Sequence, residues 1–184
     1  MRIWVRGVSC SGKTRVSRML SRRLGLKHIE LDEYHWLPGW KERGSDEFAA
    51  LVMQETHSDN WVMDGNYDKL SKYLTCNPDL MIWLNYPLWI VIWRCIKRTI
   101  WRISSREHVC NGNRESLRQQ FTKDGSMLYW VITTYRRRRH QLEEHKLAGH
   151  NIMEIKHPKD VNDLADKVAR LFEVRLYDVG NPEQ

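Results

Sequence analysis

Short apolar runs alternate along this chain with longer segments in which apolar residues recur every three or four positions. The first pattern is typical of β-strands, and the second is typical of helices with one buried face. The run at 79–85 is apolar between its polar ends, which predicts a strand buried on both faces of a sheet. The short runs predict five strands, over residues 2–6, 27–31, 60–65, 79–85 and 151–155.

The longer segments predict the helices. In the first helix Val16, Met19, Leu20 and Leu24 lie at helical spacing, and Gly25 supplies a C-terminal stop. Serines are expected to cap two of the other helices, and prolines suit the first turn of two more. These helices are expected from Ser45, after residue 65 to about 74, from Pro87 to about 103, from Ser126 to about 147, and from Pro158 onward.

The alternation of strands with helices predicts the fold class. It favours an α/β fold in which a five-stranded parallel sheet is flanked by helices and joined by right-handed crossovers. Residues 104–125 are polar, charged and contain glycine. We therefore expect a single domain over residues 1–184 with a small flap at about 104–125. Trp89, Trp93 and Trp101 lie at helical spacings before this flap and are interpreted as packing residues.

Composition limits the class of protein. The chain has 184 residues, of which 41% are hydrophobic and 29% are charged, as is ordinary for a globular domain. Its most apolar stretch, 80–93, contains Asn85 and Pro87 and is too short to span a membrane. Arg2 and Arg6 argue against a signal peptide. The four cysteines lack paired spacing, which favours a reducing cytoplasm over a disulfide framework or a zinc ribbon.

Positive charge is concentrated in one quarter of the chain. The net charge is +7, but residues 94–140 carry twelve Lys or Arg and only three Asp or Glu, so that the remainder is slightly acidic. Such a segment either binds an anion or forms a solvated face.

A Walker A sequence, "GVSCSGKT", lies at 7–14 between the first strand and the first helix. Glycines let backbone N–H groups face phosphates, and the helix N-terminus adds its positive end. Lys13 is expected to reach the β- and γ-phosphates of ATP, and Thr14 to offer a hydroxyl to Mg²⁺. Cys10 is interpreted as a filler of the loop. The expected nucleotide-binding residues of this segment are Gly7, Ser9, Cys10, Ser11, Gly12, Lys13 and Thr14.

Three polar residues follow predicted strands at the edge where parallel sheets bind ligands: Asp32, Asp64 and Asn85. An acid near the γ-phosphate can hold Mg²⁺-bound water or accept the proton of an acceptor hydroxyl. A helix cap or a loop hydrogen bond is the alternative for each aspartate.

The chain resembles the P-loop nucleoside monophosphate kinases. It is more closely similar to the small adenylate-kinase-like proteins labelled "DNA topology modulation protein" (FlaR type). The resemblance covers nearly the whole chain. It rests on "GVSCSGKT", on "LDEYHWLPGW" at 31–40, on "WVMDGNY" at 61–67, on "GNRE" at 112–115 and on "TYRRRR" at 134–139.

The resemblance implies ATP and Mg²⁺ as cofactors, with Asp64 in the Mg²⁺ shell. Adenylate kinases continue Asp-Gly with Phe-Pro-Arg, whereas this chain continues with Asn66 and Tyr67, so the arginine that grips the AMP phosphate is missing. Asp32 occupies the place where shikimate- and gluconate-type kinases put an acceptor-binding aspartate. A hydroxyl acceptor is therefore as possible as a nucleotide, with Asn66 and Tyr67 in the substrate site.

The resemblance also assigns roles to arginines. Arg94 would lie near the adenine and Arg98 near the phosphates, while Arg114 and Arg118 would be flap arginines that close on the γ-phosphate. Solvated surface charge is the alternative. Tyr34, His35, Trp36 and Trp40 follow Asp32 and either stack on an acceptor ring or anchor their loop to the core.

Four consecutive arginines, at 136–139, occupy the helix expected from Ser126. At about 100° per residue, Arg139 lies near the centre of the apolar stripe of this helix, Arg136 and Arg138 flank it, and Arg137 faces away. An inward arginine needs a partner, either a phosphate in the active site or an internal acid. On the first alternative, Arg139 serves catalysis and Arg136 the edge of the substrate site. The stripe consists of Leu128, Ile132, Tyr135 and Leu142.

Two classes of function follow. The first is an ATP-dependent phosphotransferase that moves the γ-phosphate of ATP–Mg²⁺ to a small nucleotide-like or hydroxyl acceptor. The second is an ATP-binding protein that uses residues 94–140 on nucleic acid. The sequence favours the kinase, because no helix-turn-helix or other nucleic-acid reader is recognisable. It predicts no membrane partner and does not indicate an oligomeric state.

Overall fold

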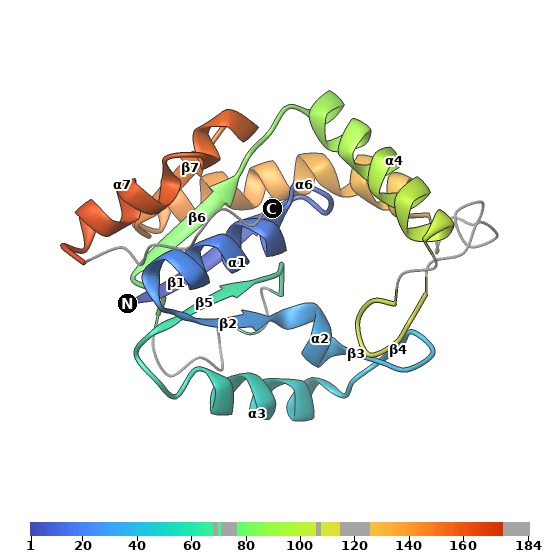
Figure 1. The fold of residues 1–184 in the computed structure, drawn as a ribbon, viewed down its shortest axis with the longest axis horizontal. Coiled ribbons are helices and arrows are strands. Elements are labelled where there is room, and N and C mark those ends of the chain that lie inside the picture. Colours follow the sequence, from blue (N-terminus) through green and yellow to red (C-terminus); the bar gives the residue numbers. More distant parts are fainter. Residues whose placement is uncertain (68–69, 71–76, 106–107, 115–125, 175–184) are drawn as a thin grey trace.

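The computed structural model describes residues 1–67, 70, 77–105, 108–114 and 126–174. Within these residues a five-stranded sheet forms the centre of the molecule (Figure 1). Its strands are β1 (Arg2–Gly7), β2 (Lys27–Glu30), β5 (Trp61–Asp64), β6 (Leu80–Leu84) and β7 (Ile152–Ile155).

All neighbouring strands of this sheet are parallel, and their order is β2-β5-β1-β6-β7. This confirms the predicted fold class, and each of the five strands lies within a range predicted from the sequence or extends it by one residue. The pairing aligns Val5 with Asp64, Glu30 with Asp64, and Gly7 with Leu84. The carboxyl ends of β2, β5 and β1 therefore lie next to one another.

Helices cover both faces of the sheet. The described helices are α1 (Lys13–Leu24), α2 (Leu31–His35), α3 (Ser45–Glu55), α4 (Leu88–Ser104), α6 (Met127–Leu147), the 3₁₀ helix η2 (Pro158–Val161) and α7 (Leu164–Leu171). A short antiparallel hairpin, β3 (Trp36–Leu37) with β4 (Lys41–Glu42), follows α2. In Figure 1, strands β2 and β5 point toward the side of the molecule where α2 and this hairpin lie.

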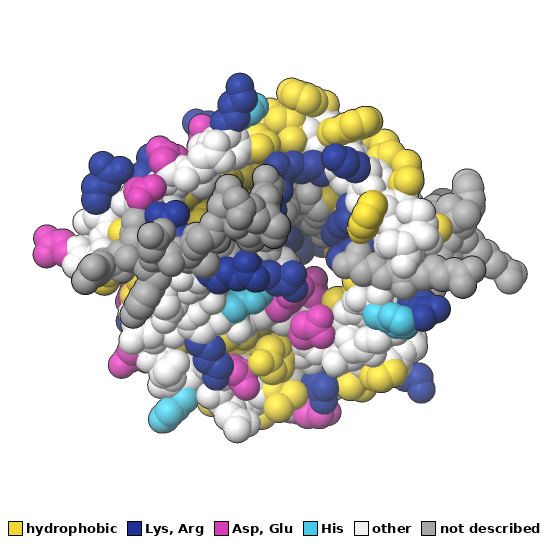
Figure 2. All heavy atoms as spheres, viewed as in Figure 1, with side chains coloured by type: hydrophobic (Ala, Val, Ile, Leu, Met, Phe, Trp, Pro, Cys, Tyr) yellow, Lys and Arg dark blue, Asp and Glu magenta, His cyan; other side chains and the backbone are white. Residues whose placement is uncertain are grey.

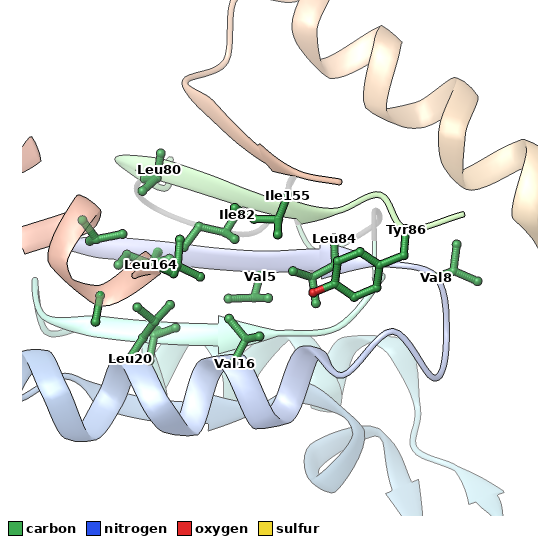
Figure 3. Packing of buried hydrophobic residues seen from close by; sticks show 14 of the residues in the cluster. Val5, Val8, Val16, Leu20, Leu80, Ile82, Leu84, Tyr86, Ile155 and Leu164 are labelled. Carbon is green, nitrogen blue, oxygen red and sulfur yellow. The ribbon is translucent and has the colours of Figure 1, made fainter. Parts of the chain in front are cut away.

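The alternation of side chains along β1 separates two hydrophobic clusters. Val5 and Ile3 face a cluster with Val16 and Leu20 of α1 and Leu164 of α7 (Figure 3). On the opposite face, Trp4 packs with Phe48, Ala49 and Val52 of α3 and with Leu31 of α2. Strand β6 is buried along its whole length, as its apolar sequence predicted.

Several helix boundaries differ from the sequence-based expectation. Gly44, not Ser45, is the N-cap of α3, and Ser45 is the first helical residue. The helix expected from Pro158 is divided into η2 and α7. By contrast, the Ser126 hydroxyl does cap α6, because it accepts a 3.2 Å hydrogen bond from the Tyr129 amide. The helix expected after residue 65 falls mostly outside the described residues.

The tryptophans of α4 are not packing residues. Trp89, Trp93 and Trp101 are 69%, 63% and 66% exposed, so that interpretation is wrong. The buried face of α4 is instead formed by Ile90, Val91 and Cys95, which belong to the same hydrophobic cluster as the strands and helix α1. In the described part of the chain, no helix has both the length and the apolar character needed to cross a membrane.

Candidate active site

The loop between β1 and α1 takes a conformation that depends on glycine. Gly7 has φ +142° and Gly12 has φ +97°. A Cβ on Gly7 would lie 2.6 Å from the carbonyl oxygen of Leu84, so a side chain does not fit there. Cys10 also has a positive φ of 66° and is buried. The loop ends where α1 begins at Lys13, which places a helix N-terminus with free N–H groups at this point.

Asn66 and Arg94 hold this loop from two sides. The Asn66 amide donates to the Gly7 carbonyl at 2.7 Å, and its oxygen faces the Gly7 N–H at 3.4 Å. Arg94 Nη1 donates to the Ser11 carbonyl at 2.7 Å, and its guanidinium lies 5.2 Å from the centre of the Tyr86 ring. Both residues therefore contact the phosphate-binding loop, whereas Asn66 was expected in the substrate site.

Lys13 is half-buried among charged groups. Its Nζ lies 3.4 Å from the Val8 carbonyl oxygen. Burial lowers the pKa of Lys13, and the charges of Asp32 and Asp64 oppose this effect. The sequence-predicted lysine and both aspartates thus lie close enough to interact electrostatically.

Thr14 and Asp64 meet at the carboxyl end of β5. The Thr14 hydroxyl donates to Asp64 Oδ1 at 2.8 Å, and Glu30 Oε1 lies 3.3 Å from the same hydroxyl. Asp64 is 3% exposed, and its Oδ2 lies 2.8 Å from His28 Nε2. Burial raises the pKa of Glu30, and the nearby charge of Asp64 raises it further. A hydroxyl and a carboxylate in contact are oxygen ligands of the kind that Mg²⁺ takes beside nucleotide phosphates.

His28 and Glu30 were not identified from the sequence. Both lie on β2 two positions apart, so the alternation of side chains turns them to the same face of the sheet. That alternation is visible in the sequence, but nothing in it indicates that β2 pairs with β5 and brings His28 to Asp64.

Asp32 follows β2, as predicted, and lies in the first turn of α2. The Tyr67 hydroxyl donates to Asp32 Oδ1 at 2.7 Å. The two residues meet because Gly65, with φ +140°, turns the chain so tightly that a Cβ there would lie 2.9 Å from Leu31 Cβ. Burial raises the pKa of Tyr67, and the charge of Asp32 raises it further, so this hydroxyl stays protonated.

The aromatic residues after Asp32 form a connected group. The His35 ring lies 4.8 Å from Trp36, 5.2 Å from Phe48 and 4.7 Å from Tyr67, measured between ring centroids. Tyr34 and Tyr67 also pack against the cluster of buried residues on the α3 side of the sheet. The rings therefore anchor this segment to the core, which was one of the two alternatives. Stacking on an acceptor stays a prediction.

Residues 108–114 of the expected flap bind to the same segment. Asn111 Nδ2 lies 2.6 Å from the carbonyl oxygens of both Glu33 and Trp36. Asn113 donates to the Leu37 carbonyl at 3.0 Å and accepts from the Trp40 amide at 2.9 Å. These amide contacts join the described part of the flap to the α2–β3 segment.

Arg114 is exposed and donates from Nε to His108 Nε2 at 2.8 Å. Its expected role at the γ-phosphate stays a prediction, and Arg118 lies outside the described residues.

Arg98 lies one turn after Arg94, and its Nε and Nη2 atoms are buried. The charge of Arg98 lowers the pKa of Lys13, but its effect is smaller than that of burial and of the two aspartates. A pocket of about 450 Å³ lies along α4 and is lined by Arg94, Lys97, Arg98, Ile100, Trp101 and Ser104.

The prediction that Arg139 faces inward is wrong, whereas Arg137 is exposed, as predicted. Arg138 is buried, at 8% exposed, whereas Arg136, Arg137 and Arg139 are exposed. The expected stripe assumed that Ile132 faces inward, but Ile132 is 49% exposed. The buried line of α6 is instead Val131, Thr134, Arg138 and Leu142.

Arg138 lies near Arg6, the last residue but one of β1. Its Nη1 donates to Gln141 Oε1 at 2.7 Å. Burial, and then the charge of Arg138, lower the pKa of Arg6 to about 9. Arg6 lies between the rings of Trp4 and Trp83, 4.8 and 4.9 Å from their centres, and its Nη1 is 2.7 Å from His145 Nε2. The inward arginine therefore belongs to a cluster with Arg6 and His145.

Figure 2 shows a hollow near the middle of this face of the molecule. Lys and Arg side chains lie above it, toward α4, and also at its lower left, beside the Asp and Glu side chains that lie below it, toward α2. The hollow is thus lined by charges of both signs.

Solved structures of kinases share the fold of this chain. The shikimate kinase of Bacteroides thetaiotaomicron aligns with a TM-score of 0.56 at 16% identity, covering 95% of this chain and 99% of that chain. The shikimate kinase of Aquifex aeolicus aligns with 0.55 at 15%, covering 94% and 96%. A gluconokinase from Sinorhizobium meliloti 1021 aligns with 0.53 at 19%, covering 94% and 93%. The chain has a P-loop kinase fold.

A comparison of sequences finds a relative that matches a shorter part of the chain. A protein described as "Putative adenylate kinase" from Thermococcus onnurineus (strain NA1) is 38% identical over 73 residues, which is 36% of this chain. The matched region spans about two fifths of that relative's length. No family model matches the chain. The resemblance to P-loop kinases is thus confirmed for the fold, and the resemblance to DNA topology modulation proteins stays a prediction.

Proposed function

We propose that this P-loop kinase fold catalyses the transfer of the γ-phosphate of ATP to a hydroxyl group of a small acceptor. The observation that carries the proposal is the convergence of four predicted groups near the carboxyl ends of β1 and β5. The Thr14 hydroxyl contacts Asp64 at 2.8 Å, and the charges of Asp64 and Asp32 both act to raise the pKa of Lys13.

The residues present fit ATP and Mg²⁺. The loop at 7–12 has no space for a Cβ at Gly7, and α1 turns its N-terminus toward the same place, as a phosphate-binding loop requires. Bound ATP–Mg²⁺ would supply the phosphoryl group and a stabilised leaving group. Thr14 and Asp64 would hold the metal, Lys13 the phosphates, and the pocket beside Arg94 and Arg98 the base.

Asp32 is proposed to receive the acceptor. Tyr67 fixes its Oδ1, so Oδ2 would accept the hydrogen bond of the acceptor hydroxyl. The acceptor oxygen would form a bond to the γ-phosphorus while the bond to ADP breaks, and the hydroxyl proton would pass to Asp32 and then to water. Lys13 and Arg98 would balance the charge of the transferred group.

ATP turnover with candidate acceptors tests this function. ADP release by the purified chain would be measured with nucleoside monophosphates, nucleosides and small hydroxyl compounds, and products would be identified by mass spectrometry. Lys13→Ala should abolish acceptor-dependent release. Lys167→Ala is the matched control, because Lys167 forms a surface pair with Asp163. Release that no acceptor stimulates would count against the proposal.

A second candidate is binding to a nucleic-acid backbone. The observation that favours it is the exposure of Arg136, Arg137 and Arg139 on one helix. Such binding should weaken steeply with added salt, because it releases condensed counterions. Replacing these three arginines by glutamine should then abolish duplex binding without changing ATP turnover.

A further inference from the structure

The acceptor side of the site carries negative charge. Asp32 and Glu33 lie in α2, and Glu42 lies opposite Trp36 in the β3–β4 hairpin. Burial lowers the pKa of His35, and the charges of Glu42 and Asp32 oppose this effect. Burial likewise raises the pKa of Cys110 to about 12, and the charges of Asp32 and Glu33 add to the increase, while the smaller effect of Arg102 opposes it. All three carboxylates therefore act on the same small group of side chains.

Within the described residues, Asp32 and Glu33 accept their side-chain hydrogen bonds from neutral groups. Asp32 Oδ1 accepts from the Tyr67 hydroxyl at 2.7 Å, and Glu33 Oε2 accepts from the Asn111 amide at 3.2 Å. Among the described residues of this segment, Arg43 is the half-buried cation, and it donates to the Tyr34 carbonyl at 2.7 Å and pairs with Glu47. Its charge is thus directed to α3.

Aromatic rings complete this side. His35 lies edge-on to Trp36, and Trp36 lies 5.6 Å from Trp40 at an interplanar angle of 79°. Trp36 and Trp40 are half-buried, so part of each ring faces solvent. Ring faces bind flat apolar groups and attract cations, and they offer nothing to a phosphate or a carboxylate.

We propose that the acceptor bears no anionic group: its hydroxyl is carried by an uncharged or aminated molecule with a flat ring or apolar face. This rests on the kinase function proposed above and names the substrate class of the same site. An acceptor phosphate or carboxylate would lie against Asp32, Glu33 and Glu42, and like charges at a binding site oppose association. An amine would be attracted by the same carboxylates.

Matched acceptor pairs test this inference. Each nucleoside would be compared with its 5′-monophosphate, and glucose and glucosamine with gluconate, by ADP release and by mass spectrometry of the product. Since like-charge contacts cost several kcal/mol, kcat/KM should be at least about tenfold higher for the uncharged or aminated member. A preference for the anionic members would overturn the inference and leave the kinase function standing.

Charge variants provide a second measurement. Glu33→Gln and Glu42→Gln should each raise the turnover of an anionic acceptor relative to its uncharged partner. Glu143→Gln should not change this ratio. Glu143 lies on α6, far along the chain from α2, and its carboxylate pairs with Lys146. An unchanged ratio in both acceptor-side variants would overturn the inference. If neither class of acceptor raises ADP release above the Lys13→Ala background, the kinase function is overturned, and the inference with it.

Discussion

At the scale of single residues, Asp64 shows how much of the site depends on one carboxylate. Its Oδ1 accepts from Thr14, and its Oδ2 contacts His28 at 2.8 Å, so both oxygens are oriented by neighbours. Partners of this kind orient the groups that hold a metal and are nearly as important as the ligands themselves.

His28→Ala should therefore weaken the response to Mg²⁺. Because removal of such a partner typically lowers metal affinity 10- to 100-fold, we expect the Mg²⁺ concentration for half-maximal ATP binding to rise by about tenfold. Fluorescence titration with Mg²⁺ at fixed ATP measures this. His57→Ala, at an exposed position after α3, is the matched control. Equal Mg²⁺ curves for both variants would show that His28 has no part in holding Asp64.

Tyr67→Phe tests the partner of Asp32. The substitution removes the hydroxyl that donates to Oδ1 and leaves the ring packed against His35 and Phe48. Hydrogen bonds to charged groups contribute about 1.5–3 kcal/mol, so we expect kcat to fall by about tenfold or more with ATP affinity unchanged. Tyr129→Phe on the exposed side of α6 should leave both constants at the wild-type value.

At the scale of elements, the β1–α1 loop was the most accurately predicted part of the site. Its glycines lie where the sequence pattern placed the phosphate-binding turn, and both have a positive φ. The pattern succeeds because a backbone that closes over phosphates requires residues without a Cβ at fixed positions.

Three alanine substitutions should rank by the space around them. Gly7→Ala meets the Leu84 carbonyl oxygen at 2.6 Å, and Gly12→Ala meets Arg94 Nη1 at 3.2 Å, whereas Gly44→Ala meets nothing within 4 Å. A left-handed conformation costs a residue with a Cβ about 1–2 kcal/mol. We expect urea unfolding to show the largest loss of stability for Gly7→Ala, a loss near this value for Gly12→Ala, and little change for Gly44→Ala. Equal stabilities would contradict the loop geometry.

Helix α6 shows why the orientation of a helix was harder to predict. Its extent and its Ser126 cap were predicted, but the phase of its buried face was shifted by one residue, from Arg139 to Arg138. Apolar residues occur all around this helix: Tyr129, Trp130 and Ile132 are each nearly half exposed. The sequence alone therefore offered no single apolar stripe, and the packing of α6 against α4 and β1 decided which face is buried.

At the scale of the whole molecule, the cluster of Arg6, Arg138 and His145 links stability to pH. Burial, then the charges of Arg6 and His150, lower the pKa of His145 from 6.5 to about 4. The unfolded chain therefore binds more protons than the folded chain between these values. Stability should fall as the pH decreases from 6.5 to about 4.

His145→Gln should reduce this pH dependence. Glutamine keeps an acceptor for Arg6 but does not titrate, so the urea midpoint should decrease less between pH 6.5 and pH 4.5 than it does in the wild-type chain. His140→Gln is the matched control, because His140 is exposed and pairs with Glu144 at the surface. If both variants keep the wild-type slope, His145 does not titrate as the buried cluster requires.

The contacts within the acceptor site were the part of the structure that the sequence predicted least well. Asp32 and Tyr67 were both named as site residues, but their 2.7 Å contact joins residues 35 positions apart. The contacts of Asn111 and Asn113 with the segment after Asp32 span more than 70 positions. Such pairs depend on the order of strands and on the path of loops, which local periodicity does not encode.

The sequence by itself determined the five strands, the phosphate-binding loop and the positions of Lys13, Thr14, Asp32 and Asp64, because strand periodicity and glycine requirements act over a few neighbouring residues. The tertiary structure decided which side chains meet. Pairing of β2 with β5 brings His28 to Asp64, and the packing of α6 turns Arg138 inward in place of Arg139. These outcomes follow from burial and long-range pairing, whose energies depend on the whole fold.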